Sequence, residues 1–348
     1  MQIITAEQDL ERFIDHALTQ KCVSCDTEFV RVRTYYPELA LIQMATDDQV
    51  VLVDPLPIKD FTSLKTLFEN KDIVKIFHAP RQDLELLRHA LDIKPYNTFD
   101  TQVAAAMIGM QDQVGYEAMT REILEIQLDK SAQFTDWLIR PLSPEQLLYA
   151  AADVTHLLDI YKAFEERLGE RMQWVRDLCA PYDEDSLYTV DLAPAFVKWA
   201  LRLKNDTHRA RLWIGMQWRE ARAQKINRPR LWILKDADLL AIAKGETEEM
   251  PPGLAKALKT DIDKALPEVA EMLRVSLKPL TPKQKETFEA IKTKLAFVAA
   301  EQTIPTRYLA SKNELEAFCR NGDKPAHNSE WKNRLFWDTL DESCFASS

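Results

Sequence analysis

Strand-like runs lie only in the N-terminal part of this chain, and that distribution constrains its fold more than any other feature. Apolar, β-prone runs cover residues 23–29, 39–44, 50–53 and 73–77, and a helical pattern begins at Pro80, after the last of them. Three strands in succession, followed by strand–helix alternation, are typical of a mixed sheet with helices packed on it. We therefore predict an α/β domain over residues 1–170, whose first three strands form an antiparallel meander.

Beyond residue 170 the apolar pattern is helical. An acidic, turn-rich stretch at residues 181–186 indicates a connector, and we predict a linker over residues 171–200. Two similar stretches follow, residues 223–229 and 299–305, which are separated by 76 residues and both end at a proline. Because similarity at a fixed offset indicates repeated structural units, we predict two helical bundles, one over residues 201–277 and a shorter one over residues 278–348.

The charge of the chain is unevenly distributed. The net charge is −10, which argues against a uniformly basic nucleic-acid binder. Residues 198–235, however, contain eleven Lys and Arg against two acids, together with Trp199, Trp213, Trp218 and Trp232. This basic segment is the part of the chain best suited to contact phosphates, although a solvated helix face is the plain alternative.

The remaining composition favours a cytoplasmic protein. No apolar run approaches the length of a membrane span, and the N-terminus lacks a basic start followed by a long apolar stretch. The five cysteines form no disulfide pattern, and the pair Cys22 and Cys25 has no second pair to complete a zinc site, so we expect buried thiols. We expect no membrane partner; the sequence does not determine the oligomeric state, and a monomer is favoured.

Two acids end the first long strand-like run. Side chains alternate between the two faces of a strand, so Asp26 and Glu28 point one way while Thr27 and Phe29 point the other. Two like charges this close repel unless a cation lies between them, and Mg²⁺ or Mn²⁺ prefers carboxylate oxygens. The alternative is a strand that runs into a turn with two solvated acids.

Other acids from two separated segments could complete such a site. Asp83 falls in the first turn of the helix after residues 73–77, where an acid also complements the helix dipole. A second helix begins at Ser143 with a capping box to Gln146 and is predicted to run to about residue 169; it places Tyr149 and Asp153 on one face. Four carboxylates suit a site for two divalent ions that hydrolyses a phosphodiester, with a tyrosine to orient the water or accept its proton at higher pH.

Three motifs, in this order and spacing, resemble those of the DEDD exonuclease superfamily in its tyrosine-bearing branch. They are Asp26-Thr27-Glu28, His78-Ala79-x-x-Gln82-Asp83 and Tyr149-x-x-x-Asp153. The flanking stretches Thr34-Tyr35-Tyr36-Pro37, Leu41-Ile42-Gln43 and Thr135-Asp136-Trp137-x-x-Arg140-Pro141-Leu142 are similar to those of the bacterial ribonuclease D family. The resemblance covers nearly the whole chain, although the second helical bundle is short beside longer members.

The resemblance implies a ribonuclease H-like fold followed by two HRDC (helicase-and-RNase-D C-terminal) domains. It also implies 3′→5′ hydrolysis of RNA with a free 3′ end to 5′-mononucleotides, typically in the trimming of tRNA precursors. In this chain Asp26, Glu28, Asp83 and Asp153 would bind two Mg²⁺ or Mn²⁺ ions, and Tyr149 would position the attacking water. Weaker candidates for RNA contact are Phe29, His78, Gln82, Arg219, Arg222, Lys225, Arg228 and Arg230; for Phe29 core packing is favoured, and for His78 a role in organising the turn.

Two other functions stay open from the sequence. A DNA exonuclease of the same superfamily would need the same acids, because they do not distinguish sugars, and the ribose 2′-OH would be sensed elsewhere. A non-catalytic RNA-binding adaptor with a relict site is the alternative from another class. The presence of all five motif residues argues against the adaptor.

Overall fold

The computed structural model describes residues 1–128, 135–276, 280–326 and 329–340. Its strands form one six-stranded sheet in the order β1-β4-β3-β2-β5-β6. The strands are β1 Gln2–Ile4, β2 Cys22–Val30, β3 Glu38–Ala45, β4 Val50–Val53, β5 Val74–Phe77 and β6 Thr98–Asp100. The predicted succession of β2, β3 and β4 as neighbours is confirmed, with β3 and β4 antiparallel, while β1, β5 and β6 each join by parallel pairing. The short strands β1 and β6 were not predicted, since three residues carry little periodicity.

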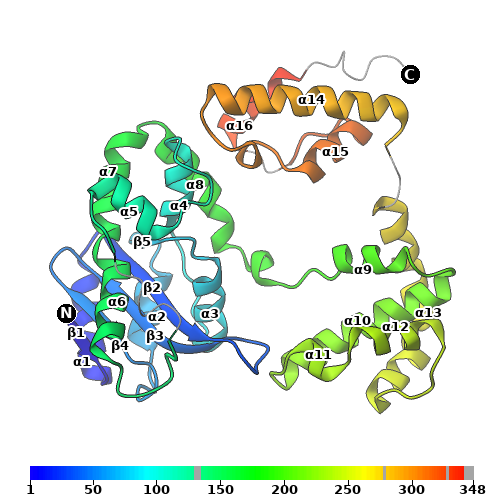
Figure 1. Ribbon diagram of the computed structural model, residues 1–348, viewed down its shortest axis with the longest axis horizontal. Coiled ribbons are helices and arrows are strands. Elements are labelled where there is room, and N and C mark those ends of the chain that lie inside the picture. The colour runs from blue at the N-terminus through cyan, green and yellow to red at the C-terminus, as the bar shows by residue number, and fades with distance from the viewer. Residues whose placement is uncertain (129–134, 277–279, 327–328, 341–348) are drawn as a thin grey trace. The chain divides into compact units, whose positions relative to one another are not determined.

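One face of the sheet is covered by α1 Glu7–Ala17, α2 Thr62–Glu69 and α3 Arg81–Leu91 (Figure 1). Alternate strand residues reach this face, and they include Val23 and Cys25 of β2 and Val51 and Val53 of β4. They pack against the apolar stripes of the three helices. Side chains repeat every two residues in a strand and every 3.6 residues in a helix, so each element presents one apolar face to the other.

The opposite face is covered by α4 Thr101–Met107, α5 Tyr116–Leu124, α6 Pro144–Thr155, α7 Leu157–Leu168 and α8 Arg171–Cys179. The single helix predicted from Ser143 to about residue 169 is in fact α6 and α7, which are separated at His156. Residues 171–179 of the predicted linker form α8, because Trp174, Val175 and Cys179 are buried in the core of this face.

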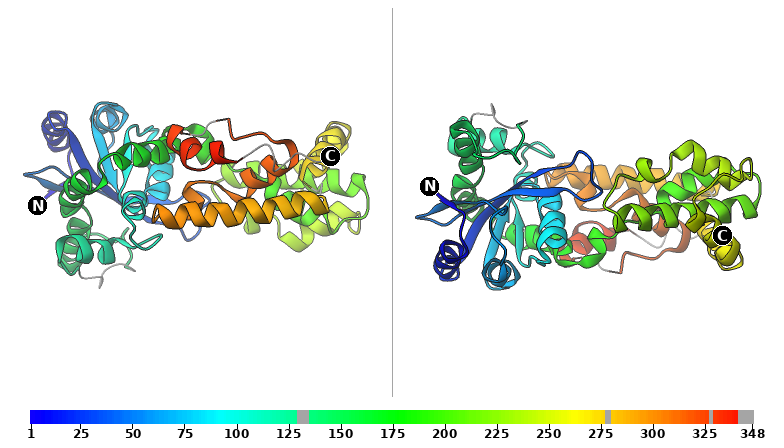
Figure 2. Two further views of the ribbon diagram at one scale, coloured as in Figure 1. Left: turned by 90° about the horizontal axis from the view of Figure 1, so that it is seen from above. Right: turned by 90° about the horizontal axis from the view of Figure 1, so that it is seen from below.

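The chain divides into two compact units. The first combines residues 1–30, 39–188 and 280–348, so it contains the sheet and the C-terminal helices α14 Pro282–Glu301, α15 Lys312–Asn321 and α16 Glu330–Leu335. In Figure 2 α14 lies alongside the shorter C-terminal helices. Trp331 of α16 stacks on Trp174 of α8 with ring centroids 4.7 Å apart, and both belong to one continuous core.

The second unit combines residues 189–279 with residues 31–38, which are the loop between β2 and β3 and the first residue of β3. Its helices are α9 Ala193–Ala200, α10 Asp206–Lys225, α11 Arg230–Ile233, α12 Asp236–Lys244 and α13 Pro252–Ser276. The helix α10 packs against both α12 and α13, and the shared core contains Phe196, Trp213 and Leu239. Trp213 is therefore a core residue.

The internal repeat is visible in the helix boundaries. The helices α10, Asp206–Lys225, and α14, Pro282–Glu301, both begin and end 76 residues apart, and α12 and α15 begin at the same offset. Each long helix leads through a turn ending in Pro229 or Pro305 to a second helix. The two copies fold alike locally, but they belong to different compact units.

In the part of the chain that the structure describes, no helix is long and apolar enough to cross a membrane. Of the described cysteines, Cys22 is a half-buried free thiol, Cys25 and Cys179 are buried free thiols, and Cys319 is buried. This confirms the expectation for Cys25 and, in part, for Cys22.

Candidate active site

Strand β2 presents its two acids to the face of the sheet that α6 covers. Ser24, whose side chain lies on the same side of the strand as those of Asp26 and Glu28, donates a hydrogen bond of 2.9 Å to the carbonyl of Val154 in α6. Phe29, whose side chain lies on the other side of the strand, packs against the core beneath α1–α3. The arrangement therefore follows simple strand alternation, and it favours core packing over base contact for Phe29.

Helix α6 presents Tyr149 and Asp153 one turn apart. Its start is fixed by the predicted capping box, in which Ser143 and Gln146 each accept a backbone hydrogen bond from the other. Gln146 also donates to the Thr135 hydroxyl at 3.0 Å, which ties the helix to the preceding stretch. Near its C-terminal end, the Tyr116 hydroxyl donates to the carbonyl of Ala152 at 3.0 Å. Contacts at both ends thus hold the helix that carries Asp153.

The stretch before α6 is anchored to the sheet by Arg140. Its guanidinium forms two hydrogen bonds with the carboxylate of Asp54, at 2.6 and 2.9 Å, and donates to the carbonyl of Ala40 at 2.7 Å. Paired, planar contacts of this kind fix orientation as well as distance. Trp137, in the same stretch, packs beside Tyr149 with ring centroids 6.0 Å apart.

The fourth acid, Asp83, lies buried in the first turn of α3, directly after β5. The Thr27 hydroxyl, between the two acids of β2, donates a hydrogen bond to its carboxylate. This contact connects the first two motifs, although Thr27 and Asp83 are far apart in the sequence.

The four carboxylates act on one another electrostatically. Burial, followed by the charges of Asp83, Asp153 and Glu28, raises the pKa of Asp26 well above its ordinary value. Burial and the charges of Asp153 and Asp83 raise the pKa of Glu28 to about 8. Burial raises the pKa of Asp83 to about 6 and that of Asp153 to about 7. Hydrogen bonds from Thr27 to Asp83 and from Tyr149 to Asp153 lower these pKa values and so oppose the effect of burial. Within the described residues, no Lys or Arg is among the charges that shift these four pKa values.

Tyr149 is half-buried and hydrogen bonds to Asp153. Burial, then the charges of Asp153, Glu28 and Asp26, raise the pKa of its hydroxyl. The phenol therefore stays protonated at neutral pH, where it can donate a hydrogen bond but cannot act as a base.

The donor set fits hard divalent cations. Asp83 is buried and the other three acids are half-buried, and no Lys or Arg among the described residues offsets their charges. Carboxylate oxygens in such a set are the ligands that Mg²⁺ and Mn²⁺ prefer. Among the described residues, no three His, Cys, Asp or Glu side chains are placed so that they could hold a metal ion as they stand. Ion binding would therefore have to draw these carboxylates together.

Comparison with known proteins decides the family. A family description of 3′–5′ exonuclease domains matches residues 1–169. The ribonuclease D of Bartonella henselae is 35% identical in an alignment that covers 97% of this chain and 88% of that protein. The chain belongs to the ribonuclease D family. Its activity is accordingly that of a 3′–5′ exoribonuclease, a hydrolase.

Solved structures agree with this assignment. The crystal structure of Escherichia coli RNase D, described as an exoribonuclease involved in structured RNA processing, matches with a TM-score of 0.79 and 26% identity. The match covers 97% of this chain and 96% of that one, so the ribonuclease D fold extends through the helical C-terminal part. The catalytic core of RRP6 from Trypanosoma brucei shares the fold, with a TM-score of 0.55 and 22% identity over 79% of this chain and 80% of that one.

Two further residues of the second ribonuclease D motif lie near Asp83. The ring of His78 is largely buried, its Nδ1 lies 2.9 Å from the hydroxyl of Thr101, and burial lowers its pKa. That hydroxyl donates to the carbonyl of Phe77 at 3.0 Å, so His78 helps to organise the turn after β5. Gln82 is exposed on the first turn of α3, and its contact with RNA stays a prediction.

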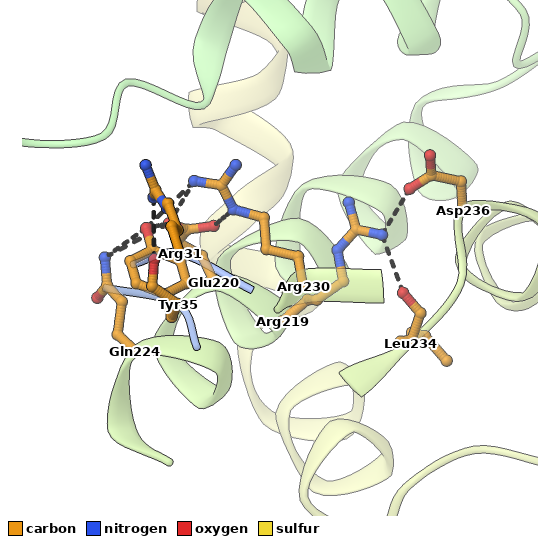
Figure 3. A network of polar contacts seen from close by, with 8 residues as sticks. All are labelled: Arg31, Tyr35, Arg219, Glu220, Gln224, Arg230, Leu234 and Asp236. Atoms are coloured by element: carbon orange, nitrogen blue, oxygen red, sulfur yellow. Dashed lines mark hydrogen bonds and ion pairs between the residues drawn. The ribbon is translucent and has the colours of Figure 1, made fainter. Parts of the chain in front are cut away.

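Two of the basic residues predicted to contact RNA pair with acids of the same unit. Arg219 is buried, whereas Arg230 is exposed, and its contact with RNA stays a prediction. Arg219 is 7% exposed, pairs with Asp236 at 2.7 Å and donates to the carbonyl of Leu234 at 3.0 Å (Figure 3). Arg230 pairs with the buried Glu220. The sequence could not show this, because a helical pattern does not say which cations are neutralised by acids elsewhere. Arg222, Lys225 and Arg228 are exposed, and their contact with phosphates stays a prediction.

The sequence reasoning missed three residues that position the candidate site. Thr27 holds Asp83, while Ser24 and Tyr116 hold the last turn of α6. For Thr27 and Ser24 a signal was available, since both are small hydroxyl residues inside the strand that carries the acids. Tyr116 had no such signal.

Proposed function

We propose that this chain removes nucleotides from RNA with a free 3′ end in a reaction that requires Mg²⁺ or Mn²⁺. The observation that carries the proposal is a set of four carboxylates from β2, α3 and α6, in which the charges of Asp83 and Asp153 add to burial in raising the pKa of Asp26 and of Glu28. Asp26, Glu28, Asp83 and Asp153 would hold two divalent ions. When bound, such ions lower the pKa of a water and stabilise the leaving oxygen of a phosphodiester.

The residues of the chain supply orientation. The hydroxyl of Tyr149, held by Asp153 and kept protonated, would position the water for in-line attack on the terminal phosphate. Thr27 would keep the Asp83 carboxylate directed toward the site. The small residues Ala150 and Ala151 allow α6 to approach the sheet closely, which keeps Asp153 near β2.

We further propose precursors of tRNA as the physiological substrate, with the first helical bundle, residues 201–277, contributing phosphate contacts. The family resemblance supports this substrate, as does the description of the E. coli relative as a processor of structured RNA. The free cysteines support a cytoplasmic location, where thiols stay reduced, and we expect a monomer.

One assay tests the proposal. The purified full chain is incubated with 5′-labelled single-stranded RNA and with DNA of the same sequence, with Mg²⁺ or with EDTA, beside Asp26→Ala and the control Asp15→Ala. Asp15 is an exposed acid on α1, so its loss removes the same charge from a surface without a site. We expect Mg²⁺-dependent shortening of RNA from the 3′ end, lost in EDTA and at least 100-fold slower in Asp26→Ala, with Asp15→Ala unchanged.

Three outcomes would contradict the proposal. Shortening that survives EDTA or Asp26→Ala would exclude the two-ion mechanism, a preference for DNA would favour a DNA exonuclease, and RNA binding without hydrolysis would favour the adaptor. Binding of Mn²⁺, followed by electron paramagnetic resonance, gives a readout that does not depend on turnover. We expect Asp153→Asn to weaken Mn²⁺ binding and Asp15→Ala to leave it unchanged.

A further inference from the structure

The second compact unit contains a pocket that the proposed active site does not use. Its volume is about 540 Å³, within the range of small-molecule sites. It is lined by residues of the β2–β3 loop and by residues from α9 to α12, all of which belong to that one unit. The buried residues Tyr35 and Arg219 form its inner part, and the exposed residues Arg31, Leu231 and Trp232 lie at its edge.

The inner part of the pocket is held rigidly by polar contacts. The Tyr35 hydroxyl donates to Glu220 and accepts from Arg230 at 3.1 Å and from Gln224 at 3.2 Å (Figure 3). Arg230 also donates to Glu220 at 2.8 Å, so its charge is neutralised. The charge of Arg219 is likewise balanced by Asp236. A wall of this kind is pre-organised, which lowers the entropy cost of binding a ligand.

The edge of the pocket offers a cation and a large aromatic surface. Arg31 is exposed and donates to the carbonyl of Tyr35 at 2.9 Å, and within the described chain no carboxylate pairs with it. Trp232 is 61% exposed and Leu231 is 56% exposed, beside Val32 at 72%. An exposed indole next to an uncompensated guanidinium suits a ligand that has both a flat ring and a negative charge.

We propose that this pocket binds one unpaired nucleotide of the RNA substrate, away from the residue being hydrolysed. The base stacks on Trp232, and a backbone phosphate pairs with Arg31. The inference rests on the proposed function, because it takes RNA as the substrate. The net positive charge of residues 198–235 favours an anionic ligand over an apolar peptide.

The test measures RNA binding by the full chain carrying Asp153→Asn, so that the RNA stays intact. Fluorescence anisotropy with single-stranded RNA compares this chain with the same chain carrying Trp232→Ala, Trp232→Phe, Arg31→Gln or two controls. The controls are Phe297→Ala, which removes an aromatic residue that is 63% exposed on α14, and Arg12→Gln, which removes an exposed arginine on α1. Hydrolysis of a dinucleotide, measured with Asp153 restored, reports on the active site alone.

Trp232→Ala should raise the Kd for RNA roughly 5- to 100-fold, as expected from the loss of one stacked base, while Trp232→Phe should stay near the parent. Arg31→Gln should weaken binding, and the fall of log K with log salt concentration should become shallower by about 0.7, the value for one lost phosphate contact. The controls and dinucleotide hydrolysis should not change. The proposal is overturned if Trp232→Ala leaves the affinity for RNA unchanged. It is also overturned if Trp232→Ala lowers that affinity no more than Phe297→Ala does. A wild-type chain inert toward both dinucleotide and RNA overturns the proposed function itself.

Discussion

At the scale of single residues, the hydroxyl of Tyr149 is the group whose role can be isolated most cleanly. Replacing Tyr149 with Phe keeps the ring beside Trp137 but removes the hydroxyl that bonds to Asp153. We expect kcat on RNA to fall about 100-fold, the lower end of the range for a positioned proton-transfer or orienting group, with KM nearly unchanged. Steady-state kinetics measure this, with Tyr96→Phe as the control. A loss confined to KM would instead assign Tyr149 to substrate binding.

Lys75 provides a prediction for pH. It is fully buried in β5 and donates to the carbonyls of Asn70 and Ile73. Burial lowers its pKa to about 8, although the charges of Cys25 and Asp183 act in the opposite direction. In the unfolded chain the pKa is near the ordinary lysine value of 10.5. Between these values the unfolded chain binds more protons, so the contribution of Lys75 to the free energy of unfolding rises with pH.

The measurement compares wild type with Lys75→Met by urea denaturation from pH 7.5 to 10.5. We expect the difference in free energy of unfolding, wild type minus variant, to increase by roughly 3 kcal/mol from pH 7.5 to 10.5, since one pKa unit corresponds to about 1.4 kcal/mol. Parallel pH profiles would show that Lys75 is not the group that titrates.

At the scale of elements, the loop between β2 and β3 is held by the turn that ends α10. The side-chain oxygen of Asn227 accepts hydrogen bonds from the amides of Tyr35 and Tyr36, both at 3.0 Å. The backbone of Asn227 has φ 48°, in the left-handed region that asparagine and glycine tolerate. One residue therefore both forms the turn and binds the loop.

Asn227→Gly separates these two roles, since glycine adopts the same backbone but lacks the acceptor. We expect faster hydrogen exchange at the amides of Tyr35 and Tyr36 and a loss of about 1–2 kcal/mol in the stability of the second unit. Asn227→Asp keeps an acceptor oxygen and serves as the control. If the two amides exchange at the wild-type rate in Asn227→Gly, the turn does not anchor the loop.

At the scale of the whole molecule, the C-terminal helices complete the core of the first unit. Trp331 stacks on Trp174, and Arg307 pairs with Asp112 at 2.7 Å. Gly109 lies so close to Thr303 that an added Cβ would be 2.9 Å from its methyl group. Residues 109–174 and residues 303–331 thus contribute to one packed region, despite the likeness of α14 to α10.

Trp331→Ala tests this shared core. Trp331 is 4% exposed, so we expect its loss to cost about 3–5 kcal/mol and to lower the unfolding temperature of the sheet-containing unit as well as the C-terminal helices. Phe297→Ala, on the exposed side of α14, should change stability by less than about 0.5 kcal/mol. Calorimetry of the full chain compares the two. A Trp331→Ala chain that loses only its C-terminal helices would show that they fold independently.

The sequence by itself determined the local structure and the chemistry. Alternation in β2 separated Asp26 and Glu28 from Phe29, the capping box at Ser143 placed Tyr149 and Asp153 on one helix face, and the 76-residue offset predicted matching helices. These properties depend on neighbours within one element, which a sequence records directly.

Only the tertiary structure decided which elements meet. It buried Arg219 against Asp236, joined Thr27 to Asp83 and assigned residues 31–38 to the unit that contains α10. It also separated the two copies of the repeat, since α14 belongs to the unit that contains the sheet, whereas α10 packs against α13 in the other unit. Periodicity shows which face of an element is apolar, but the partner of that face depends on contacts between residues far apart in the chain.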